Sequence, residues 1–196
     1  MCFLCSGDPV EGEKRQINEN TFSVSMMQAP GADPLCCLAS CFCPCCAQVY
    51  IRRKALHFDM TKYSCCQGYM DGIMPCNSGQ CGESSCPNCC LCLEAFACNG
   101  CAVSATRLMV MDRHNLRPDE WDNRIIRCNN CIQVASAICQ CLAICIPALD
   151  DAANTLQCIA QCTYASTQGC MTAQVNVELN KREDFAPMQY NDMERA

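Results

Sequence analysis

Apolar residues recur at helical spacing over the C-terminal part of the chain. Residues 131–146 place apolar side chains on one helical face, with the glutamines away from that face. Pro147 ends this helix, and Asp150 or Asp151 can cap a second helix that continues to about Val175. The short connection predicts that the two helices form an antiparallel hairpin.

Upstream of the hairpin, the helical pattern is shorter and more often interrupted. Residues 91–111 carry an uneven apolar stripe that Gly100 is expected to interrupt. Residues 63–92 are rich in Cys, Gly, Pro, Ser and Asn, so metal or disulfide cross-links are their only evident source of order. Pro44 argues against a continuous helix over residues 35–50, although a short helix could begin after it.

These patterns divide the chain into four segments. Residues 1–34 form a polar N-terminal arm, and residues 35–146 form a cysteine-rich domain. Residues 147–177 form the second helix of the hairpin, and residues 178–196 form a charged tail. The expected fold is therefore mostly α: a small irregular cysteine-rich domain with metal-stapled loops and a C-terminal helical hairpin.

Three stretches contain no formal charge and are long enough to be compared with membrane spans: residues 34–51, 128–149 and 152–177. Proline, glutamine, asparagine or threonine interrupts each of them, which makes each a poor transmembrane segment. We expect them to be core helices.

Cysteine dominates the composition, with 26 cysteines among 196 residues. Thiols must therefore fill part of the space that Leu, Val and Phe usually occupy. The net charge of -6 argues against a nucleic-acid partner. The N-terminal sequence has no secretory signal pattern, so we expect a cytoplasmic protein, or one on the cytosolic face of a membrane, with reduced thiols.

Reduced thiols spaced as Cys-x-x-Cys are typical zinc ligands, and such pairs occur at 86/89, 89/92, 98/101 and 128/131. Each zinc ion bound by four thiolates leaves a local excess of two negative charges in an already acidic chain. We therefore expect two or three structural zinc sites, with other thiols buried as small apolar groups. The candidate metal ligands are Cys41, Cys43, Cys45, Cys65, Cys66, Cys76, Cys81, Cys86, Cys89, Cys92, Cys98, Cys101, Cys128 and Cys131.

Some cysteines could instead be S-acylated (palmitoylated). Cys2 and Cys5 lie near the N-terminus, and Cys45 and Cys46 precede the basic run at residues 52–54. Two acyl groups and a basic patch suffice to hold a protein at a membrane surface. The alternative is that Cys2 and Cys5 are plain thiols on an exposed arm.

The two predicted hairpin helices each carry a Cys-x-x-x-Cys pair, Cys141 with Cys145 and Cys158 with Cys162. Such twin pairs resemble those of the small translocase chaperones of the mitochondrial intermembrane space. The four thiols could form two disulfides, hold one zinc ion, or be buried in the reduced state. We favour the buried or reduced state, and the disulfide alternative would place the protein in that compartment.

Arg107 and Asp122 are structural candidates because they flank a turn and could form an ion pair across it. If this pair is buried, removing one partner would leave the other charge without compensation. Asp119 and Asp122 have the spacing of residues that cap a short helix.

No catalytic motif is evident in the sequence. A cysteine nucleophile needs a base within hydrogen-bond reach, and only His57 and His114 could supply an imidazole. We expect both histidines to be structural or to lie on the surface. Glycine-rich phosphate loops and histidine-glutamate metal motifs are absent, so we expect no enzyme activity and identify no small-molecule substrate.

Residues 36–45, with the sequence Cys-Cys-Leu-Ala-Ser-Cys-Phe-Cys-Pro-Cys, resemble the signature of the placenta-specific-8-like cysteine-rich family. This family includes plant cell-number regulators and plant cadmium-resistance proteins. A second block from Arg107 to Cys131 is also similar, although His114 stands where tyrosine is usual and Arg127 where a paired cysteine is common. The resemblance implies a membrane-associated, often oligomeric protein that is linked to organ size or heavy-metal tolerance and has no known enzymatic activity.

Taken together, we expect a non-catalytic, zinc-binding adaptor or assembly subunit, and the acylation candidates would allow it to work at a membrane surface. Its partners would be other proteins or further copies of the chain. One alternative is a factor that binds, buffers or exports zinc or cadmium. Another is a disulfide-pinned hairpin protein of the mitochondrial intermembrane space.

Overall fold

The computed structural model describes residues 7–8, 12–72 and 77–183, and it confirms the mostly α-helical fold that the sequence predicts. Two short strands pair in parallel beside the helices. In chain order, the elements are η2 (Lys14–Ile17), β1 (Asn20–Thr21), α1 (Ala29–Ala32), α2 (Pro34–Phe42), α3 (Pro44–Ala55), η3 (Met60–Lys62), η4 (Cys65–Gly68), α4 (Pro87–Ala97), α5 (Asn99–His114), β2 (Leu116–Arg117), α6 (Glu120–Cys145), η5 (Pro147–Leu149) and α7 (Asp150–Glu183).

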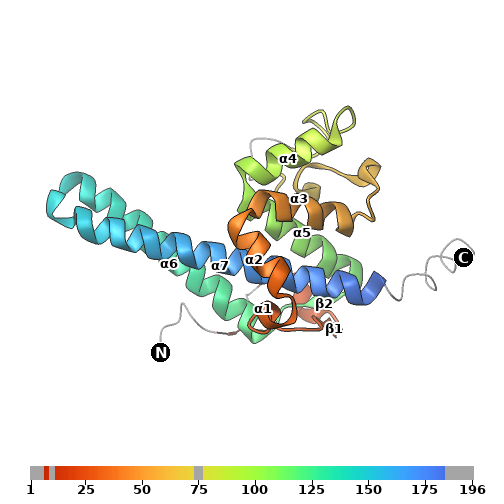
Figure 1. Cartoon of the computed structure of the whole chain (residues 1–196), viewed down its shortest axis with the longest axis horizontal. Helices are drawn as coiled ribbons and strands as arrows, with labels where there is room; N and C mark the ends of the chain where they lie inside the picture. Colours follow the sequence, from red (N-terminus) through yellow and green to blue (C-terminus); the bar gives the residue numbers. More distant parts are fainter. Residues whose placement is uncertain (1–6, 9–11, 73–76, 184–196) are drawn as a thin grey trace, which may run out of the picture.

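Helix α7 links the two parts of the molecule. Figure 1 shows that its first half runs alongside α6 in a hairpin that projects from the body, while its second half lies within the body. There α7 packs against α1, α2, α3 and α5. The core of the body includes Ile51, Leu91, Val110 and Val175, which are almost completely buried.

Residues 12–34, the described part of the segment predicted as a polar arm over residues 1–34, pack largely onto the body. Met26 and Ala29 are fully buried. Asn20 of β1 pairs with Leu116 of β2. Backbone pairing and burial of these few apolar residues are enough to hold a segment whose composition is mostly polar.

The C-terminal boundary also differs from the prediction, because α7 continues past residue 178 as far as Glu183. Glu178 and Leu179 are buried. The carboxylate of Glu178 accepts hydrogen bonds from the Ser23 backbone N–H at 2.7 Å and from Arg182 Nε at 2.6 Å. A charged residue is therefore part of the core here because it has partners on both sides.

Two helix boundaries lie where the sequence places them. Pro44 occupies the first turn of α3 and separates it from α2. Asp119 and Asp122 form a reciprocal capping box at the start of α6. The break between α4 and α5 lies at Cys98, two residues before the expected Gly100, and the two helices are bent by 117° there.

Polar side chains hold the α6–α7 hairpin together from within. Gln133 Nε2 donates to the Ala160 carbonyl at 2.7 Å, and Gln140 Nε2 donates to the Ala153 carbonyl at 3.1 Å. Small alanines at these positions let the two helices approach closely enough for the bonds to form. The hairpin itself is therefore as predicted, but its inner face is the glutamine face.

The apolar face of α6 points outward. Val134, Ile138 and Leu142 are 59%, 56% and 48% exposed. Helix α6 is long and apolar enough to cross a membrane, and only 17% of its most apolar 18-residue window is buried. The expectation of a core helix over residues 128–149 is therefore wrong, because the helix projects beyond the body that would have covered it.

Arg107 and Asp122 form a buried ion pair between α5 and the first turn of α6. Arg107 Nη2 lies 2.5 Å from Asp122 Oδ2, and the side chains are 5% and 0% exposed. Gln174 of α7 donates to the other carboxylate oxygen at 3.1 Å, and the ring of Phe22 lies 5.0 Å from the guanidinium. The pair thus joins α5, α6, α7 and the N-terminal segment.

Replacing Asp122 with alanine should destabilise the protein by about 3–5 kcal/mol, because the buried guanidinium of Arg107 loses its counter-charge. Urea denaturation followed by circular dichroism measures this change. Glu120→Ala is the matched control, since Glu120 lies in the same first turn but its side chain is 76% exposed. The control should cost no more than about 0.5 kcal/mol. Equal losses from the two variants would contradict a special role for the buried pair.

Candidate metal centre

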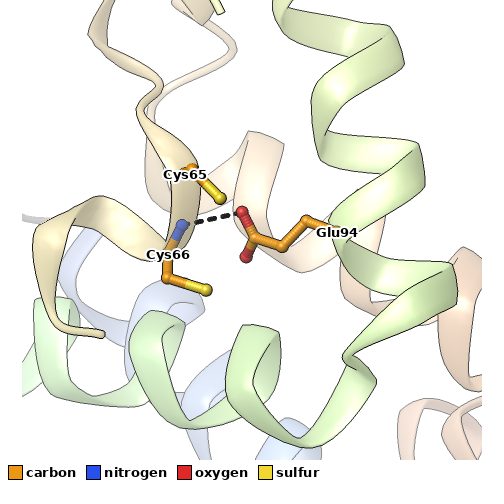
Figure 2. A group of neighbouring side chains, drawn as sticks. All are labelled: Cys65, Cys66 and Glu94. Carbon is orange, nitrogen blue, oxygen red and sulfur yellow. Dashed lines mark hydrogen bonds between the residues drawn. The ribbon is translucent and has the colours of Figure 1, made fainter. Parts of the chain in front are cut away.

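Cys65, Cys66 and Glu94 converge at the junction of η4 and α4. One ligand atom from each residue lies within 4.8 Å of the other two. Figure 2 shows both sulfur atoms beside the carboxylate of Glu94. Across the described residues, this is the group of three or more Cys, His, Asp or Glu side chains that could hold a metal ion.

An unusual backbone turn positions the two thiols. Cys66, Gln67 and Gly68 have φ angles of 44°, 50° and 75°, so two non-glycine residues lie in the left-handed region. Such conformations persist only where surrounding contacts hold them, and they are common at functional sites. Here the Cys66 N–H donates to Glu94 Oε2 at 2.9 Å, and the Cys65 N–H donates to Glu83.

The carboxylate of Glu94 is almost fully buried and has further partners on its other side. Arg52 Nη2 lies 3.0 Å from Oε1, and Tyr63 OH donates to Oε2 at 2.8 Å. Arg52 is itself fully buried, and it also donates to the Ala102 carbonyl and to Thr106 Oγ1. The candidate centre is therefore built onto a buried ion pair.

Burial raises the pKa of the Cys66 thiol, and the nearby Glu94 carboxylate raises it further. The pKa of Cys65 is raised by the same two causes and by Glu83. Both groups are consequently neutral thiols at pH 7 in the metal-free protein. A metal ion that binds them must displace their protons, so its affinity should increase with pH.

The donor set fits a divalent ion of the zinc type. Two thiolates and one carboxylate would contribute three negative charges, which a divalent cation and the Arg52 guanidinium would neutralise. Arg52 Nη1 is buried without a hydrogen-bond acceptor, so it is available to a negatively charged group at this site. The Cys81 thiol lies within hydrogen-bond reach of Cys65 and could supply a fourth ligand.

The structure gathers few of the sequence-predicted metal ligands at one point. Cys65 and Cys66 lie in the cluster, with Cys81 beside them, whereas Cys128 and Cys131 lie within α6. The start of α3 carries the exposed thiol of Cys43 and the half-buried thiol of Cys45. Helix α4 carries the exposed thiols of Cys86, Cys89 and Cys92 at its start and within it. The start of α5 carries the half-buried pair Cys98 and Cys101. Cys76 and the acylation candidates Cys2 and Cys5 lie outside the described residues.

Sequence reasoning missed Glu94, although a signal was present. Glu94 is the one charged residue between Glu83 and Arg107, in a segment otherwise made of small and apolar residues. A single carboxylate on an apolar helix is expected to have a buried partner. That partner is Arg52, which the sequence analysis assigned to an exposed basic patch.

Of the basic patch expected at residues 52–54, only Arg53 is exposed. Arg52 and Lys54 are buried, and Lys54 Nζ donates to Asn176 Oδ1 at 2.9 Å. Arg52 and Lys54 instead bind Glu94 in the core and Asn176 of α7. Cys46 remains exposed, but the nearby charge that would assist an acyl anchor is largely absent.

A second group of thiols lies where α2 meets α7. Cys37 is within hydrogen-bond reach of Cys41 and Cys170. Gly169 makes this approach possible, because a Cβ atom there would lie 2.9 Å from the sulfur of Cys41. Burial raises the pKa of Cys37 to about 12, and the neighbouring sulfurs add to the shift. These thiols, among them the predicted metal ligand Cys41, act as small packing groups.

The twin cysteine pairs of the hairpin do not face one another. The contact between Gln140 and Ala153 sets the register of the two antiparallel helices. In this register Cys145 lies level with the turn, and Cys158 lies level with a position on α6 about ten residues before Cys145. At about 1.5 Å per residue, this is an offset of about 15 Å, too far for a disulfide. Cys141 and Cys162 show the same offset, and all four thiols are free and exposed. This register does not bring the four thiols together for the disulfide or zinc alternatives, and the thiols are free as favoured but exposed instead of buried.

No protein-family model matches this chain, and no curated protein or solved structure matches it significantly.

A double-mutant cycle at Arg52 and Glu94 should reveal strong coupling. Arg52→Met and Glu94→Gln should each cost about 3–5 kcal/mol, and the double variant should cost at least about 1 kcal/mol less than their sum. Urea denaturation with a chelator present measures all four proteins. The exposed Arg124–Glu120 pair, with its atoms 3.4 Å apart, is the control cycle and should give at most about 0.5 kcal/mol. Additive losses at Arg52 and Glu94 would contradict the network.

Proposed function

We propose that this protein is a non-catalytic assembly subunit that self-associates through the outer face of α6 and whose body is stabilised by a bound zinc ion. The observation that carries the proposal is the uncharged apolar surface on the projecting hairpin. The resemblance to the placenta-specific-8-like family, whose members are often oligomeric, agrees with it.

The α6 face has the properties of a protein interface. Val134, Ile138 and Leu142 are exposed on a helix that the internal hydrogen bonds of the hairpin already hold rigid. A rigid surface loses little conformational freedom on association. Exposed apolar patches of this kind are typical of interaction surfaces.

Charge favours a second copy of the chain over an anionic membrane as the occupant of this face. Residues 128–180 contain no Lys or Arg, and Asp150 and Asp151 stand at the tip of the hairpin. An anionic lipid surface would repel this tip and find no cation to attract. Two α6 faces can instead pack symmetrically and remove each other's apolar side chains from water.

Replacing Ile138 with aspartate should weaken self-association at least about tenfold, because a charge would be buried in the interface. Sedimentation velocity over a range of concentrations measures the effect. Asn154→Asp is the matched control, because it adds the same charge to an exposed position of α7 in the same hairpin. A wild-type protein that stays monomeric would contradict self-association, and flotation of that monomer with neutral phosphatidylcholine vesicles would assign the face to lipid.

The zinc part of the proposal rests on the ligand geometry at Cys65, Cys66 and Glu94. Bound zinc would link η4 to α4 across the candidate centre. When bound, the ion supplies a cross-link between these segments. The chain's own residues hold it in place and, through Arg52, balance its charge.

Cobalt titration of the reduced full-length protein should show one tight site with thiolate-to-metal charge-transfer absorption. Cys65→Ser and Cys66→Ser should each abolish this absorption at stoichiometric metal, whereas Cys92→Ser, at an exposed position of α4, should retain it. Zinc should compete with cobalt, and its removal by a chelator should lower the denaturation midpoint. Equal loss of the signal in all three variants, or no signal in the wild type, would contradict the site.

A metal-handling role is the second candidate, and the number of accessible thiols favours it. Such a protein would bind several zinc or cadmium ions and exchange them while its fold survives. The exposed cysteines of the described residues are Cys43, Cys46, Cys86, Cys89, Cys92, Cys141, Cys145, Cys158 and Cys162. Binding of several rapidly exchanging equivalents, unaffected by Cys66→Ser, would support this role over the structural one.

A further inference from the structure

Two helices of the body begin with the same cysteine arrangement. Cys43 is the N-cap of α3 and Cys86 is the N-cap of α4, and each is followed by a proline in the first helical turn. Cys46 and Cys89 occupy the third helical position. The two N-cap residues have closely similar backbone angles, with φ and ψ of -135° and 69° in one and -146° and 72° in the other.

Each pair presents two thiols that are already in contact. The thiol of Cys46 lies close to the Cys43 sulfur, and the thiol of Cys89 lies close to the Cys86 sulfur. All four side chains are exposed. Residues three apart at a helix start are close enough for a disulfide after a small adjustment, which the non-helical N-cap residue can make.

The two thiols of each pair lie at different places on the helix. Cys43 and Cys86 are N-cap residues at the positive end of a helix, where a thiolate is favoured, whereas Cys46 and Cys89 lie in the first turn. This is the usual division between an attacking and a resolving cysteine.

Among the described residues, the other Cys-x-x-Cys pairs lack this presentation: Cys89 with Cys92 and Cys128 with Cys131 lie inside α4 and α6. Cys98 is also an N-cap residue, but no proline follows it, and burial raises the pKa of its partner Cys101. The space beside Gly100, between them, is closed by Tyr164, whose hydroxyl would lie 2.6 Å from a Cβ atom there. The arrangement at α3 and α4 is therefore a specific feature of two sites.

We propose that Cys43 with Cys46, and Cys86 with Cys89, are two redox-active dithiol centres that exchange with low-molecular-mass disulfides such as glutathione disulfide. The N-cap thiolate attacks one sulfur of the small disulfide, whose S–S bond breaks and releases one small thiol. The second cysteine then attacks the mixed disulfide and releases the other small thiol. Two electrons and two protons pass from the protein dithiol to the small disulfide, which leaves one intramolecular disulfide at the helix start.

The test equilibrates the reduced, metal-free full-length protein in glutathione buffers of increasing oxidised fraction. Acid quenching, alkylation of free thiols and peptide mapping then locate each disulfide. We expect the Cys43–Cys46 and Cys86–Cys89 disulfides to form first and to reverse when the glutathione is reduced. At neutral pH, Cys86 should react with a small alkylating agent about tenfold faster than Cys92, which is equally exposed on α4.

Removing the resolving thiol separates the two steps of exchange. Cys46→Ser and Cys89→Ser should accumulate glutathione on Cys43 and Cys86, whereas Cys92→Ser should leave both disulfides unchanged. Oxidation spread evenly over the exposed cysteines would overturn the proposal. So would the absence of intramolecular disulfides in the wild type, or protection of both pairs by stoichiometric zinc, which would make them metal ligands.

Discussion

The body depends on the burial of one cation. The guanidinium of Arg52 is fully removed from water, so the fold must supply acceptors in fixed places around it. Glu94 provides the charge from α4, and Thr106 and the Ala102 carbonyl provide the remaining acceptors from α5. Three helices are therefore oriented by hydrogen-bond geometry at a point where cysteine and other small side chains offer little apolar volume. Tyr63 then fixes the loop before η4 to the same carboxylate.

The same arrangement explains how the candidate metal centre can exist in an acidic, thiol-rich chain. Two thiolates beside the buried carboxylate of Glu94 would be unfavourable without a nearby positive charge. The guanidinium of Arg52 supplies that charge. The raised pKa values of Cys65 and Cys66 favour neutral thiols, so the charges of Glu94 and Arg52 balance each other. A divalent ion that displaces the thiol protons would find the charges already balanced. The buried ion pair is thus both the structural centre of the body and the electrostatic support of the metal proposal.

Local signals in the sequence predicted much of the secondary structure. The helix break at Pro44, the capping box of Asp119 and Asp122, and the C-terminal hairpin all follow from short-range chemistry. The inner face of the hairpin could not be predicted in this way, because periodicity identifies two faces of a helix without showing which one meets a neighbour. Glu94 was missed for a related reason: its partner Arg52 is 42 residues away, and only the packing of α3 against α4 brings them together.

Cysteine has three different physical roles in this chain, and burial separates them. Where α2 meets α7, Cys37 and Cys41 let two helices approach at Gly169, and their thiols pack as small groups. Beside Glu94, partly buried thiols converge with a carboxylate and acquire the geometry of metal ligands. At the starts of α3 and α4, exposed thiols lie next to backbone N–H groups, which favour the thiolate. The packing role and the proposed ligation and redox roles thus fall to one residue type, because the backbone determines how much water and which partners each sulfur meets.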